Sequence, residues 1–263
     1  MASSLAAVLK QRIGKVYLIT FNRPEKKNAL TFEMYKDIKE ALSEADNDKS
    51  TVLTAVTGRG DYFSSGADLA ASLKRMQSGE PASVTRDNLD RKNFIPAIID
   101  HRKPLIALVN GPAVGIACAM LGLFDLVYCS SKATFHVPFV QLGLACEGCT
   151  SFTFPLIMGP GKASEMLIFS KKLTAIEAQQ CSLVAEVFPD DVFERESLKR
   201  LTAYSKLPPE SMLISRSLIR NRYRRKLHDI NERETDVVTQ RVTSTEFKDA
   251  VLRFSQRKDR SKV

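Results

Sequence analysis

The pattern that most constrains the fold of this chain is a strand that ends in a turn of small residues and passes into a helix, and it occurs twice. The first copy has the β-branched, apolar run Val52–Thr57, followed by Gly58–Leu69. The run predicts a buried strand, and Gly58 and Gly60 should end it. The second copy covers Lys103–Asp125 and again places a Gly-rich turn after an apolar run. Two such turns can face one site, where small residues let a ligand lie directly against the backbone.

Length and composition indicate a globular protein. The chain has 263 residues, of which 44% are hydrophobic and 26% charged, so it can bury one large core or two smaller ones. No apolar run approaches the ~20 residues that span a bilayer, and we expect a soluble, non-secreted protein without a membrane span. Five cysteines, an odd number, favour reduced thiols. Cys146 and Cys149 form a C-x-x-C without a second pair or a nearby His, so no metal site is expected.

The charge balance favours an anionic partner. The formal net charge is +9, which suits nucleic acid, acidic lipid or a phosphorylated small molecule. The chain has no zinc-finger pattern, no RNP-type aromatic motif and no Gly-rich nucleic-acid loop, so we expect no specific nucleic-acid partner.

Periodicity and capping residues predict the other elements. Thr31 is a candidate N-cap, and Thr174 with Glu177 has the spacing of a capping box. The expected strands are Val16–Phe21, Leu126–Ser130, Thr134–Val137 and Leu183–Phe188. The expected helices are 32–49, 68–79, a further helix that ends near His101, Lys162–Phe169, Thr174–Cys181, Glu210–Lys226 and Glu232–Gln256.

A series of short motifs, in this order, resembles those of the enoyl-CoA hydratase/isomerase (crotonase) superfamily, with the closest likeness to its peroxisomal Δ3,Δ2-enoyl-CoA isomerase branch. The motifs are Phe21-Asn-Arg-Pro with Asn28-Ala-Leu, then Phe63-Ser-Ser-Gly-Ala-Asp-Leu, then Lys103-Pro-Leu-Ile-Ala with Asn110-Gly-Pro-Ala-Val-Gly. The likeness covers nearly the whole chain. It implies an α/β fold, a crotonase-like spiral of ββα turns over residues 1–206, followed by a C-terminal helical oligomerisation region over 207–263.

The resemblance also implies an acyl-CoA thioester site. Two backbone N–H groups, those of Ala67 and Ile116, would stabilise the enolate oxygen of the substrate, with the helix that starts at Ile116 adding positive potential. Lys26 and Lys27 would approach the phosphates of CoA. The residues expected to bind substrate are Ser65, Gly66, Ala67, Asp68, Leu69, Ala70, Ala71, Ile116 and Lys26.

One carboxylate stands in a suitable place for catalysis. Hydratases of the family use two glutamates to activate water, but Ala119 and Phe139 occupy the matching positions here. Glu147 matches the catalytic glutamate of the isomerase branch, and one base suffices if it takes a proton from C2 and returns it to C4. His136 is a rival that we interpret as a hydrogen-bonded core histidine or a pocket residue.

The resulting prediction is a Δ3,Δ2-enoyl-CoA isomerase of fatty acid β-oxidation, with CoA as part of the substrate and no other cofactor. Another crotonase-fold enzyme, either a hydratase or a dienoyl-CoA isomerase, is one alternative, and a catalytically inert scaffold is another. The family implies a homotrimer or a dimer of trimers. We interpret the basic run Arg216 to Lys226 as a solvated helix face, with CoA phosphates and nucleic acid as alternative partners.

The last three residues give an expectation for location. Ser261-Lys262-Val263 differs from the peroxisomal address Ser-Lys-Leu in its final residue, and basic residues precede it. The alternative is a mitochondrion, since the N-terminal residues up to Arg12 have serine, alanine and basic residues and no acid. A strand beginning by Val16 leaves little room for a transit peptide, so we expect a peroxisomal protein.

Overall fold

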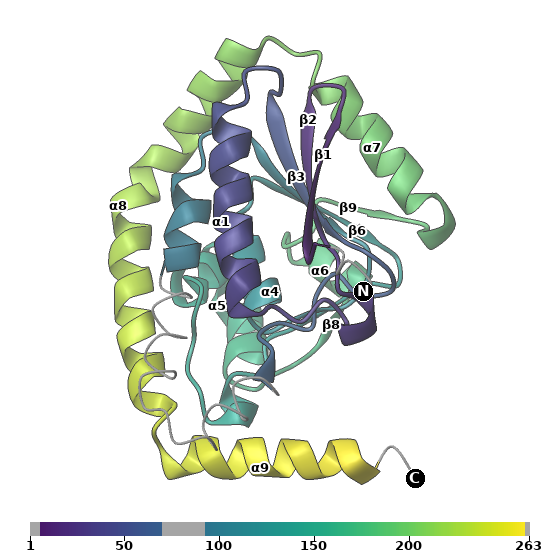
Figure 1. The fold of residues 1–263 in the computed structure, drawn as a ribbon. Coiled ribbons are helices and arrows are strands. Elements are labelled where there is room, and N and C mark those ends of the chain that lie inside the picture. The colour runs from purple at the N-terminus through teal and green to yellow at the C-terminus, as the bar shows by residue number, and fades with distance from the viewer. Residues whose placement is uncertain (1–5, 70–92, 261–263) are drawn as a thin grey trace.

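The computed structural model describes residues 6–69 and 93–260 as a mixed α/β structure. A six-stranded sheet has the order β1-β2-β3-β4-β6-β9; β1 runs antiparallel to β2, and every other neighbour is parallel. Parallel neighbours need crossover connections, and α1 (Phe32–Asn47) supplies the one between β2 and β3 (Figure 1). The strands are β1 (Val8–Ile13), β2 (Val16–Phe21), β3 (Leu53–Gly58), β4 (Leu105–Val109), β6 (Leu126–Ser130) and β9 (Glu186–Phe188).

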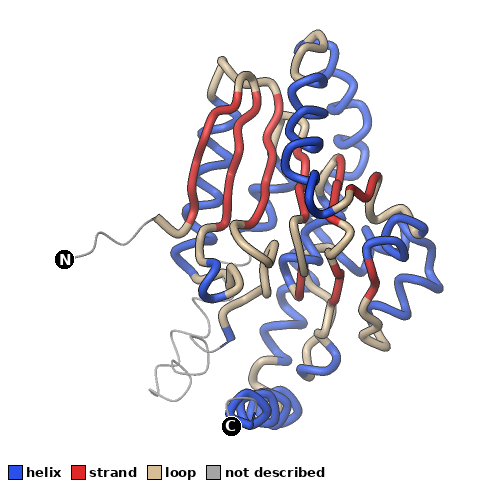
Figure 2. Tube along the Cα trace, turned by 90° about the vertical axis from the view of Figure 1, so that its right-hand side faces the viewer, coloured by secondary structure: helices blue, strands red, loops and turns tan. Residues whose placement is uncertain are grey.

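A second, three-stranded sheet of order β5-β7-β8 and several helices complete the described chain (Figure 2). Its strands are β5 (Ala113–Val114), β7 (Thr134–His136) and β8 (Leu173–Thr174). The helices are α4 (Ile116–Ala119), α5 (Thr150–Leu167), α6 (Ala175–Gln180), α7 (Phe193–Tyr204), α8 (Pro209–Arg241) and α9 (Thr245–Arg260), with a helical segment at 93–100 and 3-10 turns η1 (Pro24–Lys26), η2 (Met120–Leu123), η3 (Val140–Leu142) and η4 (Asp190–Val192). No helix among the described residues is long and apolar enough to cross a membrane.

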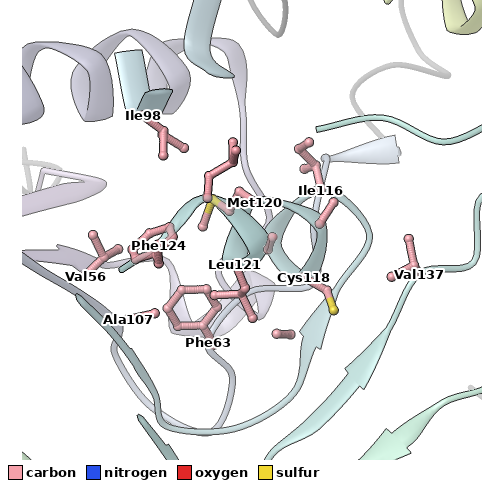
Figure 3. Packing of buried hydrophobic residues seen from close by; sticks show 14 of the residues in the cluster. Val56, Phe63, Ile98, Ala107, Ile116, Cys118, Met120, Leu121, Phe124 and Val137 are labelled. Atoms are coloured by element: carbon pink, nitrogen blue, oxygen red, sulfur yellow. The ribbon is translucent and has the colours of Figure 1, made fainter. Parts of the chain in front are cut away.

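The central strands β2, β3 and β4 of the larger sheet are buried on both faces, which explains their nearly continuous apolar sequences. Ala55 of β3 and Leu108 of β4 belong to a smaller cluster that includes Leu201 of α7. Val56 and Ala107, one residue away in each strand, belong to the main core (Figure 3). That core continues into the α4–η2 segment, so packing on the sheet fixes the helix that starts at the second Gly-rich turn. The other core side chains labelled in Figure 3 are Phe63, Ile98, Ile116, Cys118, Met120, Leu121, Phe124 and Val137.

Several predicted elements are confirmed. Val16–Phe21 and Leu126–Ser130 are strands with those bounds, and Thr31 caps α1 by accepting a hydrogen bond from the Met34 N–H. Thr174 and Glu177 form the expected capping box at the start of α6. The helix expected at 68–79 lies almost wholly outside the described residues.

Two helix boundaries were predicted wrongly. The helix expected from residue 162 is the second half of α5, which begins at Thr150 and kinks at Gly159, where φ is +77°. The two C-terminal helices divide at 242–244 and not near residue 230, since α8 runs unbroken from Pro209 to Arg241. Polar residues in the middle of α8 resemble a break, but Asn231 and Glu234 are buried on its inner side.

The interpretation of the basic run as a solvated helix face is wrong for two arginines. Arg216 is only 9% exposed, and its guanidinium pairs with Asp125 at 2.5 Å. Arg220 contacts the same carboxylate at 3.4 Å and donates to the Leu123 carbonyl. These arginines dock α8 against the segment between α4 and β6. Arg222, Arg225 and Lys226 remain exposed, as expected.

Candidate active site

A cavity of about 520 Å³ lies where both Gly-rich turns meet the loop before α5. The turns follow the carboxyl ends of the parallel strands β3 and β4, the edge at which open α/β sheets commonly bind ligands. The lining is mainly apolar and comes from distant parts of the chain, including α9. Its described residues are Ser65, Ala67, Leu69, Val114, Gly115, Ile116, His136, Pro138, Phe139, Gln141, Leu142, Leu144, Glu147, Ala250 and Arg253.

The first turn leaves one amide directed to no other described residue. The backbone N–H groups of the neighbouring residues are hydrogen-bonded. The pairs are Ser64 to Pro112 O, Ser65 to Lys27 O, Gly66 to Ser64 Oγ, Asp68 to Leu30 O and Leu69 to Ala67 O. Among the described residues, the Ala67 N–H has no hydrogen-bond acceptor. Ala67 is half-buried, and a partly desolvated amide of this kind needs a partner, which a ligand in the cavity can supply.

Direct backbone contacts join the two turns. The Val114 N–H donates to Ser64 O at 3.0 Å, and Gly66 packs against Val114 so closely that a Cβ on the glycine would lie 2.6 Å from the Val114 oxygen. Gly66 also has φ +82°, which a side chain would strain. Glycine is therefore required here for the approach of the two turns.

The second turn presents another N–H group. Gly115, with φ +58°, donates to His136 O at 2.8 Å, and α4 begins at Ile116. The Ile116 N–H is in the first helical turn, where no intrahelical acceptor exists, and it has no acceptor among the described residues. Because α4 has only four residues before the 3-10 turn η2, its dipole adds less potential than a full helix would.

Glu147 completes the lining of the cavity. It is 9% exposed and precedes Gly148, whose hypothetical Cβ would lie 3.1 Å from Ile116 Cδ1 and 3.2 Å from Ala119 Cβ. The loop that carries Glu147 thus packs directly on α4. The Glu147 carbonyl accepts a 2.9 Å hydrogen bond from the Thr150 hydroxyl, which restrains the backbone of this residue.

Glu147 is the sole carboxylate among the described residues that line the cavity. Ala119 is fully buried beside the Glu147 loop, and Phe139 is buried at the cavity wall. Neither can transfer a proton. The cavity therefore has the groups for one-base proton transfer and lacks, in its described lining, a second acid for activating water.

His136 is both a strand histidine and a lining residue. Its Nε2 lies 3.1 Å from Ser170 O, and since a carbonyl can only accept, Nε2 carries the proton. Burial lowers the pKa of His136 below its ordinary value, which favours the neutral imidazole. Both parts of the prediction for this residue therefore agree with its position.

The residues predicted to bind substrate differ in where they lie relative to the cavity. Ser65, Ala67, Leu69 and Ile116 line the cavity, whereas Gly66 shapes the turn. The Asp68 carboxylate contacts the Arg23 guanidinium at 3.3 Å and so links the turn to the loop after β2. Lys26 is exposed on that loop and is not part of the lining. Ala70 and Ala71 lie outside the described residues.

Sequence analysis missed several residues at the site. Ala250 and Arg253 of α9 line the cavity, and Glu234 of α8 is buried behind Glu147. Leu227, Asn231, Glu234 and Val238 recur at spacings of four, three and four along one side of α8. A carboxylate in such a stripe is unusual enough to mark a function.

No group of three or more potential metal ligands occurs among the described residues. Cys146 and Cys149 are not bonded to each other, and burial raises the pKa of both thiols. Raised pKa values oppose the thiolate form that a metal requires.

Comparisons of sequence and of structure both find that the chain is similar to enoyl-CoA hydratases and isomerases. A profile of the family described as "Enoyl-CoA hydratase/isomerase" matches residues 11–261. A rat protein, "Enoyl-CoA delta isomerase 2", is 49% identical over 98% of the chain, and the alignment spans 65% of the rat protein's length. A mouse protein, "Enoyl-CoA delta isomerase 3, peroxisomal", is 48% identical over 93% of the chain and 77% of its own length.

A solved structure of an enoyl-CoA hydratase/isomerase from Pseudoalteromonas atlantica T6c superimposes with a TM-score of 0.86 at 34% identity. The match covers 96% of this chain and 98% of that protein. This agreement confirms the predicted fold class. The chain accounts for slightly less than two thirds of the rat relative.

Proposed function

Because the chain belongs to the enoyl-CoA hydratase/isomerase family, we propose that it is a Δ3,Δ2-enoyl-CoA isomerase, which converts 3-enoyl-CoA into 2-trans-enoyl-CoA in fatty acid β-oxidation. The observation that carries the proposal is one cavity whose described lining has Ala67, Ile116 and a single carboxylate, Glu147. The two delta isomerases named above support the same activity.

In the proposed mechanism, the thioester oxygen accepts hydrogen bonds from the Ala67 and Ile116 N–H groups. The Glu147 carboxylate removes a proton from C2, and the C2–H electron pair moves into a dienolate whose oxygen those amides stabilise. Each amide donor of this kind is worth roughly 3 to 4 kcal/mol. The protonated Glu147 then returns the proton to C4 as the double bond forms between C2 and C3. Glu147 therefore both removes the proton and returns it, so no second acid is needed.

CoA recognition is a further part of the proposal. Lys26 and Lys27 lie in the loop after β2, and the Lys27 carbonyl accepts the Ser65 N–H at 2.9 Å. The loop is thus attached to the first turn. We assign the exposed Lys26 ammonium to the CoA phosphates, which an ammonium binds as a point charge.

The test compares two reactions with purified protein. Incubation with 3-hexenoyl-CoA should produce conjugated 2-hexenoyl-CoA, whereas 2-hexenoyl-CoA should show little hydration. Efficient hydration with no isomerisation would favour the hydratase alternative, and absence of both reactions, with CoA-ester binding retained, would favour the inert scaffold.

We also infer a peroxisomal location and a trimeric assembly. The name of the mouse relative supports the first, together with Ser261-Lys262-Val263, which lies outside the described residues. Exposed apolar side chains suited to a subunit interface support the second: Ile168, Phe169, Ile176, Leu218 and Ile219. Imaging with and without residues 261–263 tests the location, and sedimentation equilibrium tests the assembly.

A further inference from the structure

A buried carboxylate of the C-terminal helical region holds the loop that carries Glu147. Glu234 of α8 is 7% exposed. Its Oε2 accepts the Cys149 N–H at 2.6 Å, and its Oε1 accepts the Ser151 N–H at 2.9 Å. The two carboxylate oxygens therefore bind the N–H groups of the residues before and after Thr150, where α5 begins.

The segment that Glu234 holds has an unfavourable backbone conformation. Gly148 has φ +70°, and Cys149 has φ +64°, the left-handed region that non-glycine residues seldom occupy. Cys149 is also the N-cap of α5, and no side-chain cap of its own satisfies the first amides of that helix. Glu234 replaces the missing cap from another helix and compensates for the cost of the turn.

Other contacts attach the same loop to α8. The Arg241 Nε donates to Gly143 O at 2.9 Å, and the Cys149 thiol lies 3.4 Å from the Leu227 carbonyl. The loop from Gly143 to Cys149 is thus fixed to α8 near both ends, with Glu147 between them. A cavity of about 20 Å³ is lined by Glu147 and Gly148 on this loop and by Asn231, Thr235 and Val238 of α8, among other residues.

A carboxylate at this buried position carries a desolvation cost. Burial raises the pKa of Glu234, the nearby charge of Glu147 raises it further, and the Ser151 and Cys149 amides oppose the shift. A glutamine could accept from one of the two N–H groups, but its own NH₂ would face the other. The site therefore uses a group that can accept twice, at the cost of placing two carboxylates near each other.

Resting on the function proposed above, we propose that Glu234 is a positioning residue for catalysis: by binding the Cys149 and Ser151 amides, it fixes the Glu147 carboxylate against α4 and the two amide donors. The C-terminal helices are then part of the active site of the same chain, in addition to any role in assembly.

The test measures isomerisation of 3-hexenoyl-CoA by Glu234→Gln beside Asp236→Asn, an exposed acid two residues along the same helix. Since a misplacement near 1 Å can cost about 100-fold in rate, Glu234→Gln should lower kcat about 10- to 100-fold with KM within about twofold. Asp236→Asn should match the wild type. A Glu234→Gln enzyme with wild-type kcat, or one in which KM alone rises, overturns the proposal.

A double-mutant cycle separates positioning of the base from general destabilisation. In a Glu147→Gln background the base is gone, so adding Glu234→Gln should leave the residual rate within about twofold. An equal further loss in that background would show that Glu234 acts on the whole fold and would overturn the proposal.

Hydrogen exchange gives a readout that does not depend on activity. Amides in peptides covering residues 143–151 should exchange faster in Glu234→Gln than in the wild type, and Asp236→Asn should leave them unchanged. If the wild type proves unable to isomerise 3-enoyl-CoA, the proposed function fails. Unchanged exchange in Glu234→Gln would instead overturn the holding of the loop, whatever the activity.

Discussion

Substitution of Asp125 by Asn should destabilise the protein through the buried arginines of α8. Asp125 Oδ2 accepts from Arg216 Nε at 2.5 Å and from the Leu105 N–H at 2.8 Å, while Oδ1 lies 3.4 Å from Arg220 Nε. The side chains of Asp125, Arg216 and Arg220 are 20%, 9% and 20% exposed. Removing the carboxylate charge therefore leaves two guanidinium groups largely desolvated without their counter-ion.

Breaking one partner of a buried ion pair typically costs about 3 to 5 kcal/mol. Arg216 Nη2 already lacks a hydrogen-bond partner among the described residues, so it has little capacity to compensate. The partial exposure of Asp125 and the remaining bond from Arg216 Nη1 to His101 O reduce the loss. We expect Asp125→Asn to lower the free energy of unfolding by about 3 kcal/mol.

The assay is urea denaturation followed by circular dichroism at a fixed protein concentration, because assembly makes stability concentration-dependent. Asp100→Asn is the matched control, since Asp100 and Arg224 form an ion pair with side chains 43% and 46% exposed. Such a surface pair is worth about 0 to 1 kcal/mol. A loss in Asp125→Asn no larger than that of Asp100→Asn would refute the docking role assigned to the two arginines.

Two further predictions concern the oxyanion donors and pH. Ala67→Pro removes an N–H that no other described residue uses and should lower kcat about 10²- to 10³-fold, whereas Ala67→Ser keeps the N–H and much of the rate; equal rates for the two variants would contradict the assigned donor. Burial lowers the pKa of His101 to about 4 from an ordinary value of 6.5, so the unfolded chain takes up a proton before the folded one does. The resulting stability is present above pH 6.5 and is lost as pH falls from 6.5 towards 4, by up to about 1.4 kcal/mol per unit. Urea midpoints across this range should fall less steeply in His101→Gln, and parallel slopes would contradict the prediction.

The sequence predicted best those parts of the fold that depend on local residue patterns. β2 and β6 are short apolar runs, and the caps at Thr31 and Thr174 satisfy amides within three residues of themselves. Local chemistry decides such features, so their bounds can be read from neighbouring residues.

Long-range partners could not be predicted in this way. Glu234 binds a backbone N–H 85 residues away, and Arg216 pairs with a carboxylate 91 residues away. A polar residue on a long helix looks solvated until its partner is known, which is why the middle of α8 resembled a break. The motifs did indicate the residues of the two turns, and the likeness to the isomerase branch indicated Glu147, but the contribution of α9 to the cavity follows from tertiary packing alone.

The central claim is that Glu147 is the single base of a 1,3-proton transfer, and Glu147→Gln tests it most directly. The substitution keeps the shape of the side chain and leaves the Ala67 and Ile116 amides in place. Loss of a general base typically costs 10²- to 10⁴-fold, so turnover of 3-hexenoyl-CoA should fall by about that factor while CoA-ester affinity stays within about threefold. A Glu147→Gln enzyme with near-normal turnover would contradict the one-base mechanism.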